Sequence, residues 1–130
     1  IQLQSANSLE GRRVLYIDNE SDSLKGISAL LKGWGVDVIM VEDLEQLASL
    51  FIETSHVDLL IADYHLDNQT TGIDAIRMCQ HHFGDSLPTI LLTADSSGQA
   101  EREASEVNAH FQGKPVKPAA LRSLMAHLIK

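Results

Sequence analysis

The chain has 130 residues, 44% of them hydrophobic, which suffices for one domain with its own core and excludes a mainly disordered chain. Ten lysine and arginine residues against 18 aspartate and glutamate residues give a net charge of −8, which argues against direct binding of nucleic acid, because phosphate contacts need a basic surface. The single cysteine, Cys79, cannot form an internal disulfide, and no apolar run approaches the roughly 20 residues of a membrane-spanning helix, which together favour a cytoplasmic domain.

The first eleven residues are polar and lack the basic and apolar regions of a signal peptide. We predict a linker or disordered lead-in over residues 1–11 and one domain over residues 12–130. An apolar run at residues 13–17 predicts the first strand, which ends in Asp18. Apolar side chains then recur at helical spacing over residues 22–34, which predicts the first helix.

The second and third strand–helix pairs follow directly. Residues 36–41 predict a strand, and capping-box spacing predicts a helix over residues 43–54. Residues 57–62 are almost entirely apolar, as in a parallel strand covered by helices on both faces, and this run ends in Asp63. A polar, turn-rich loop comes next, followed by a predicted helix over residues 73–83.

The last third of the chain continues the alternation. Residues 89–92 predict a fourth strand. The helix predicted over residues 97–107 is rich in charge and poor in large apolar residues, so we expect it to be loosely held. A short strand over residues 109–113 precedes a last helix over residues 118–130, which a proline opens at its first position.

Five strand–helix pairs in alternation predict an α/β fold of the flavodoxin-like class, a doubly wound (βα)5 domain. The connections are short, and right-handed crossovers then give a five-stranded parallel sheet in the order 2-1-3-4-5 with helices on both faces. In this order the first and third strands are neighbours. We therefore expect Asp18 and Asp63 to lie side by side at the carboxyl edge of the sheet.

Four polar residues follow strands at that edge: Asp18, Asp63, Thr93 and Lys114. Taken singly, each has an ordinary explanation as a cap, a turn residue, a β-former or a solvated side chain. Taken together, crowded carboxylates favour a bound cation, and oxygen ligands with room for water favour Mg²⁺ or Mn²⁺. With a metal, a hydroxyl and an ammonium in place, a carboxylate can act as the nucleophile of phosphoryl transfer.

Four motifs in the sequence resemble those of the receiver domains of bacterial two-component systems. They are Leu15-Tyr16-Ile17-Asp18-Asn19-Glu20, Leu60-Ile61-Ala62-Asp63, Leu91-Leu92-Thr93-Ala94 and Gly113-Lys114-Pro115. The resemblance covers residues 12–130 and implies that Asp63 is the phosphoacceptor. It also implies that Thr93 hydrogen-bonds the phosphoryl group on activation and that Lys114 pairs with it.

The same resemblance implies the Mg²⁺ ligands Asp18, Asn19, Asp63 and the backbone carbonyl of His65. Asn19 departs from the family pattern, which usually has two consecutive acids here. An asparagine carbonyl can still ligate Mg²⁺, with one charge fewer, so we predict weaker metal binding rather than none. The loop over residues 66–72 lacks the usual Met-Pro pair, and we expect it to be slightly longer and more mobile.

Other residues take supporting roles by resemblance. Thr93 and Phe111 fall at the switch positions of the family, and Pro115 falls where the family has a cis peptide bond, although the sequence alone leaves the isomer open. His65 and Asp95 lie beside the acceptor and beside Thr93 in sequence. Our hypothesis is that these two side chains modulate how water reaches the phosphoryl group.

We therefore predict a phosphoacceptor domain of a two-component phosphorelay, in which phosphorylation switches the face around the helix at residues 97–107. The predicted partner is a histidine kinase or a histidine phosphotransfer domain, and the domain would catalyse its own phosphorylation and dephosphorylation. A homodimer through that helix, the strand at residues 109–113 and the last helix is a further expectation. The domain itself would not contact a membrane, although its parent kinase can be membrane-attached.

Three sequence motifs, at residues 31–35, 62–67 and 114–121, are similar to those of C-terminal receivers of hybrid sensor histidine kinases. From this resemblance we expect the chain to be part of such a kinase. A linker-like start and the absence of an output domain after Ile129 also favour that parent over a stand-alone response regulator. A pseudo-receiver that docks partners without phosphorylation is a second hypothesis, supported only by Asn19. A flavin-binding flavodoxin-like protein is a third, opposed by the acids after the first strand, which would repel a phosphate.

Overall fold

The computed structural model describes residues 8–67 and 69–129, so residues 1–7, Asn68 and Lys130 lie outside the described residues. Within them the chain alternates strands and helices. The strands are β1 (Arg13–Ile17), β2 (Asp37–Val41), β3 (Leu59–Asp63), β4 (Thr89–Thr93) and β5 (His110–Gly113). The helices are α2 (Ser21–Gly33), α3 (Leu44–Glu53), α4 (Gly72–Phe83), α5 (Gln99–Glu106) and α6 (Pro118–Leu128). None of these helices is long and apolar enough to cross a membrane.

Most of the predicted lead-in falls in residues 1–7, outside the described residues, but its last part can be followed. Residues 8–11 form a turn that is attached to the domain. Leu9 is buried in the core, and the N–H of Gly11 donates to the carbonyl of Gly35 over 2.8 Å. Packing of the chain therefore begins a few residues before β1.

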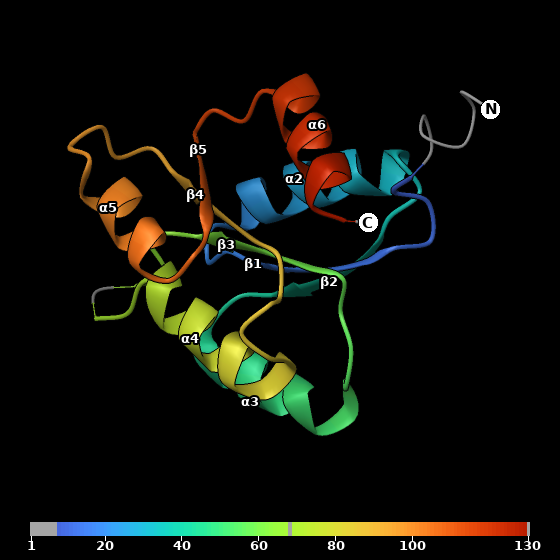
Figure 1. Cartoon of the computed structure of the whole chain (residues 1–130), viewed down its shortest axis with the longest axis horizontal. Coiled ribbons are helices and arrows are strands. Elements are labelled where there is room, and N and C mark those ends of the chain that lie inside the picture. The colour runs from blue at the N-terminus through green and yellow to red at the C-terminus, as the bar shows by residue number, and fades with distance from the viewer. Residues whose placement is uncertain (1–7, 68, 130) are drawn as a thin grey trace.

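The five strands form one parallel sheet in the order β2-β1-β3-β4-β5, which confirms the predicted doubly wound, flavodoxin-like topology. Figure 1 shows the sheet between two helical layers, with α2 and α6 on one face and α3 and α4 on the other. Because β1 lies between β2 and β3, the carboxyl ends of β1 and β3 are adjacent. The register sets Ile17 beside Ala62, one residue before each of the two aspartates.

Two hydrophobic layers cover the sheet because successive side chains of a strand point to opposite faces. Leu15 and Leu60 pack in the layer formed with α3, α4 and α5. Tyr16 and Ile61, one position along, pack in the layer formed with α2 and α6. The central strands are buried on both faces, which is why they read as continuous apolar runs.

Capping side chains fix where two helices begin. Asp43 accepts the N–H of Gln46 over 2.8 Å at the start of α3, which is one half of the predicted capping box. The side chain of Gln46 accepts the N–H of Glu42 rather than that of Asp43, over 2.8 Å. Thr71 caps α4, and Asp74 accepts the N–H of Thr71 over 2.9 Å in return. This reciprocal cap ends the loop that follows β3, so α4 begins at a defined point beside the carboxyl edge of the sheet.

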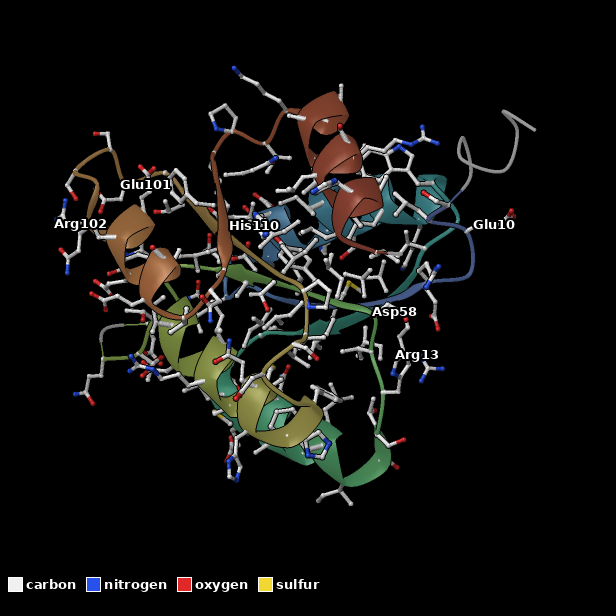
Figure 2. The ribbon with its side chains drawn as sticks, viewed as in Figure 1. Glu10, Arg13, Asp58, Glu101, Arg102 and His110 are labelled. Carbon is white, nitrogen blue, oxygen red and sulfur yellow. The ribbon has the colours of Figure 1, made fainter. Side chains whose placement is uncertain are left out.

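Helix α5 is shorter than the predicted helix over residues 97–107. Gly98 precedes it with a φ of 89°, a left-handed conformation that lies outside the helix. Among its residues only Ala100 and Ala104 are buried. Figure 2 shows Glu101 and Arg102 of this helix pointing away from the body of the molecule. The helix therefore buries little apolar surface against the sheet, in keeping with its charged sequence.

Candidate functional site

The carboxyl ends of β1, β3, β4 and β5 meet at one edge of the sheet and carry the four polar residues singled out in the sequence. Asp18 follows β1, Asp63 and Thr93 are the last residues of β3 and β4, and Lys114 follows β5. The exposed fractions are 0% for Asp18, 7% for Asp63 and 1% for Thr93. The N–H of Lys114 donates to the carbonyl of Thr93 over 2.8 Å, which fixes the start of the lysine side chain.

The ammonium group of Lys114 lies between the two aspartates. Its Nζ is 2.7 Å from Oδ1 of Asp63 and 3.2 Å from Oδ2 of Asp18, and a longer contact of 3.5 Å reaches Oγ of Ser23. Two buried carboxylates that share one ammonium retain a net negative charge. The site is therefore an anionic pocket that one lysine neutralises only in part.

Burial and the neighbouring charges together set the pKa values of Asp63 and Lys114. Burial raises the pKa of the Asp63 carboxyl, the bond from Lys114 opposes this, and the charge of Asp18 adds to the rise. For Lys114, burial acts to lower the pKa, but the bond to Asp63 and the charges of both aspartates outweigh it and raise the pKa. The lysine therefore stays protonated at neutral pH, whereas ionised Asp63 is less stable in the fold than in water.

Asp18 is held by donors on both of its oxygens. The hydroxyl of Tyr16 donates to Oδ2 over 2.6 Å, and the N–H of Glu20 donates to Oδ1 over 3.0 Å. Burial and the neighbouring Asp18 carboxylate raise the pKa of Tyr16, so its hydroxyl keeps its proton and remains a donor. These contacts fix the orientation of the buried carboxylate.

The donor atoms fit a small, hard cation such as Mg²⁺. The two carboxylates face a common point, because one ammonium contacts both. Asn19 directly follows Asp18, and His65 lies two residues after Asp63; they would add an amide oxygen and a backbone carbonyl. Within residues 8–67 and 69–129, no group of three or more histidine, cysteine, aspartate or glutamate side chains is placed to hold a metal. The site thus offers two carboxylates, as expected with asparagine at position 19.

Thr93 presents a buried hydroxyl at the edge of the site. Its Oγ1 accepts the N–H of Asp95 over 2.9 Å, which leaves the hydroxyl proton free to be donated to another group. Asp95 in turn accepts from the N–H and the hydroxyl of Ser97, over 2.9 and 2.8 Å. The bonds from Ser97 lower the pKa of Asp95, and the charge of His65 contributes less. The two predicted modulators are therefore close enough to interact.

The remaining predicted residues lie around this edge. Phe111 is half-buried in β5 and packs against the hydrophobic layer of α3, α4 and α5. The Lys114–Pro115 peptide bond is cis, the isomer that the family resemblance implies. The switch role of Phe111 stays a prediction.

Gly72 lies against the end of β3, on the other side of the loop that follows this strand. Its N–H donates to the carbonyl of Tyr64 over 2.8 Å. A Cβ at this position would overlap the carbonyl oxygen of Asp63 and would lie 2.8 Å from Cδ1 of Leu91. The first turn of α4 can therefore approach the backbone of Asp63 only because residue 72 has no side chain.

Tyr64, the residue directly after Asp63, connects the site to α5. Its hydroxyl donates to Oε2 of Glu103 over 2.8 Å, and Nε2 of Gln99 donates to the same oxygen over 2.9 Å. Burial and the Glu103 carboxylate raise the pKa of Tyr64 to about 12, so the hydroxyl donates at all physiological pH values. This bond is a polar tether between the loop that follows β3 and a helix with little apolar contact.

We predict that Glu103→Ala loosens α5. The substitution removes the tether, which is worth about 1 kcal/mol, so backbone amides of α5 should exchange with deuterium about fivefold faster than in the wild type. The control is Glu106→Ala, which removes an exposed acid from the same helix and should leave exchange unchanged. Equal exchange in Glu103→Ala and wild type would show that the tether does not hold the helix.

Three residues of the site were not singled out from the sequence. Tyr16 and Asp18 are two positions apart in and after a strand, so they share a face, and this spacing is a usable signal. Gly72 follows a capping residue and reads as an ordinary helix start. The pairing of Tyr64 with Glu103 depends on where α5 lies over the sheet, which no local pattern specifies.

The chain is similar to known proteins over nearly its whole length. The sequence profile of the response regulator receiver domain family matches residues 14–127. A protein of Arabidopsis thaliana named as a two-component response regulator is 26% identical over 112 residues, which make up 85% of this chain and 18% of that protein. This chain therefore spans less than a fifth of the length of that relative.

Solved structures share the fold. The receiver domain of a sensor histidine kinase from Pseudomonas aeruginosa, described with a magnesium ion in its active-site cleft, is 24% identical, with a TM-score of 0.78 and coverage of 92% of this chain and 98% of that one. The chemotaxis protein CheY4 of Vibrio cholerae is 20% identical, with a TM-score of 0.79 and coverage of 90% and 98%. At these identities the likeness establishes the fold.

Proposed function

Because this chain belongs to the family of response regulator receiver domains, we propose that it accepts a phosphoryl group from a phosphohistidine onto Asp63. The observation that carries the proposal is the shared ammonium of Lys114, which holds Asp63 beside Asp18 at the carboxyl edge of the sheet. A buried acid whose ionised form is destabilised is a reactive oxygen nucleophile, and the adjacent lysine can stabilise the charge of the transferring group.

In the proposed reaction an oxygen of Asp63 attacks phosphorus as the phosphorus–nitrogen bond of the phosphohistidine breaks. The other ring nitrogen of the phosphohistidine carries a proton, so the electron pair of the broken bond returns to the ring and neutral imidazole leaves, while an acyl phosphate forms on Asp63. Lys114 can follow the new phosphoryl oxygens, because its Nζ already lies 2.7 Å from the attacking carboxylate. The reaction completes without an added acid or base from the receiver side.

Asp18, Asn19, Asp63 and the backbone carbonyl of His65 are the residues that we propose hold Mg²⁺. When bound, the metal would neutralise negative charge on the transferring phosphoryl oxygens. The two oxygens of Asp18 accept hydrogen bonds from Tyr16 and Glu20. Mn²⁺ has the same preference for oxygen ligands and would occupy the same site.

We further propose that phosphorylation changes the face around α5. The proton of the Thr93 hydroxyl is available for a phosphoryl oxygen, and a shift of Thr93 toward Asp63 would open room for Phe111 to move inward. Helix α5 buries only Ala100 and Ala104, so it needs little free energy to shift. His65 and Asp95 are proposed to modulate how water attacks the phosphoryl group.

The proposed partner is a histidine kinase or a histidine phosphotransfer domain, in the cytoplasm of a bacterium. The motifs at residues 31–35, 62–67 and 114–121 favour a hybrid sensor histidine kinase as the parent protein over a stand-alone regulator. A dimer through α5, β5 and α6 is a further proposal. Each of these rests on resemblance of sequence.

The test is phosphoryl uptake from acetyl phosphate, measured by intact mass. The wild-type chain is expected to gain the mass of one phosphoryl group when Mg²⁺ is present and to gain none in excess EDTA. The second candidate, a pseudo-receiver that docks partners without chemistry, is favoured only by Asn19. No gain of mass with Mg²⁺ at any concentration would leave that candidate as the better account.

Replacing Asn19 with aspartate is expected to tighten Mg²⁺ binding by about tenfold, because it adds a full negative charge to a site with two carboxylates. Calorimetric titration of Mg²⁺ measures this directly. Asn108→Asp adds the same charge to an exposed residue outside the site and serves as the control. Equal affinities for Asn19→Asp and wild type would show that position 19 does not contribute to the metal site.

A further inference from the structure

Tyr16 is a buried polar residue that the proposed reaction does not use. Its side chain is fully buried in the layer between the sheet and helices α2 and α6. Its hydroxyl lies 2.6 Å from Oδ2 of Asp18 and 3.4 Å from the backbone carbonyl of Ser23. A hydroxyl has one proton, and the shorter contact to a charged acceptor is the one that takes it. The tyrosine therefore donates to Asp18.

The hydroxyl approaches Asp18 from a fixed position. Tyr16 and Asp18 are two residues apart on one strand and its extension, so their side chains share a face of the sheet. The ring is enclosed by packed side chains and cannot swing away. Oδ2 of Asp18 has a second contact, with Nζ of Lys114 at 3.2 Å. Unlike the tyrosine, Lys114 has a long side chain that is 17% exposed and can follow a moving carboxylate.

We propose that Tyr16 is a positioning residue, which holds the Asp18 carboxylate toward Asp63 and thereby sets the affinity of the site for Mg²⁺. The proposal rests on the proposed function only in assigning Asp18 to the metal site. Hydrogen bonds to ligating groups commonly change metal affinity by about 10- to 100-fold when they are removed. The effect should be large in this chain, because Asn19 leaves Asp18 and Asp63 as the carboxylates of the site.

The first test is a calorimetric Mg²⁺ titration of Tyr16→Phe, which removes one oxygen atom and keeps the packed ring. We expect the dissociation constant to rise about tenfold or more. Thr89→Val is the control, because it removes a buried hydroxyl that donates to the carbonyl of Leu87 at the start of β4, at the opposite edge of the sheet from Asp18. Its Mg²⁺ affinity should equal that of the wild type. An unchanged affinity in Tyr16→Phe would overturn the proposal.

A second variant pair separates positioning from general loosening of the fold. In an Asp18→Asn background the tyrosine has no carboxylate to position, so adding Tyr16→Phe should cause no further loss of Mg²⁺ affinity. A further loss of the same size in that background would show that Tyr16 acts by another route. This double-mutant cycle needs only measurements of Mg²⁺ affinity and no measurement of phosphoryl uptake.

Phosphoryl uptake supplies a readout that distinguishes this inference from the proposed function. Tyr16→Phe should need about tenfold more Mg²⁺ for half-maximal uptake while keeping the maximal rate of the wild type. If the wild type binds Mg²⁺ but gains no phosphoryl group, the proposed function fails and the titrations still test Tyr16. If uptake occurs and its Mg²⁺ dependence is the same in both proteins, the role of Tyr16 fails alone.

Discussion

Asp63→Asn is expected to abolish phosphoryl uptake, because the amide lacks the carboxylate oxygen that would attack phosphorus. Among the described residues at this edge of the sheet, Asp18 is the other buried carboxylate, and its two oxygens are already held by Tyr16, Lys114 and Glu20. Intact-mass measurement after treatment with acetyl phosphate and Mg²⁺ should show no added phosphoryl group. Asp85→Asn, which changes an exposed acid in the loop before β4, is the control and should be phosphorylated like the wild type.

The Asp63→Asn variant should remain folded, and its stability should depend on pH in a defined direction. Burial, opposed by the Lys114 bond and supported by the charge of Asp18, raises the pKa of Asp63 in the folded state. A raised acid pKa means that the folded protein binds this proton more readily than the unfolded chain, so ionisation of Asp63 costs stability above its ordinary pKa. At neutral pH the asparagine variant should therefore be more stable, by about 1 kcal/mol.

That advantage should shrink as the pH falls. The wild type regains stability when Asp63 takes up its proton, over the window between its folded pKa and its ordinary value, whereas the variant has no such group. Chemical denaturation at several pH values measures the difference in the free energy of unfolding. A variant that is less stable than the wild type at neutral pH, with a deficit that narrows as the pH falls, would contradict the assigned direction.

Gly72→Ala is expected to destabilise the fold by about 3 kcal/mol, at the upper end of the usual range for overpacking. The added methyl group would overlap the carbonyl oxygen of Asp63, which is backbone and cannot rotate away, and would press on Leu91. Relief requires the first turn of α4 or the end of β3 to move. We therefore expect phosphoryl uptake to slow as well, since the acceptor moves with its own backbone.

Gly26→Ala is the matched control, because Gly26 lies in the middle of α2 and nothing lies within 4 Å of an added Cβ. This substitution should stabilise the protein by about 0.5 to 1 kcal/mol through better helix propensity. Thermal unfolding of both variants gives the comparison. A Gly72→Ala protein with wild-type stability and uptake would show that the close approach of α4 to Asp63 is not required.

The sequence specified the fold well because its signals are local and repeated. Apolar runs at β1 and β3 and helical spacing in α2 each predict one element, and short connections leave few ways to arrange them. The strand order then places Asp18 beside Asp63 before any side chain is considered. At α5 the helix begins two residues later than predicted, because the left-handed conformation of Gly98 delays its start.

The site was predicted less completely, because its supporting contacts cross between elements. That Lys114 would contact both aspartates depends on the path of the loop after β5. The bond from Tyr64 to Glu103 depends on how α5 sits over the sheet, since α5 has few apolar anchors of its own. The Tyr16–Asp18 bond is different in kind, since alternation along a strand would have predicted it.

The position of the phosphoryl group tests the central claim most directly. Borohydride reduces an acyl phosphate on aspartate to the alcohol, so the modified residue becomes homoserine and can be located by peptide mass spectrometry. After treatment with acetyl phosphate and Mg²⁺, we predict homoserine at position 63 in the wild-type protein. Homoserine at position 18, at another acid, or at no position would contradict the assignment of Asp63 as the phosphoacceptor.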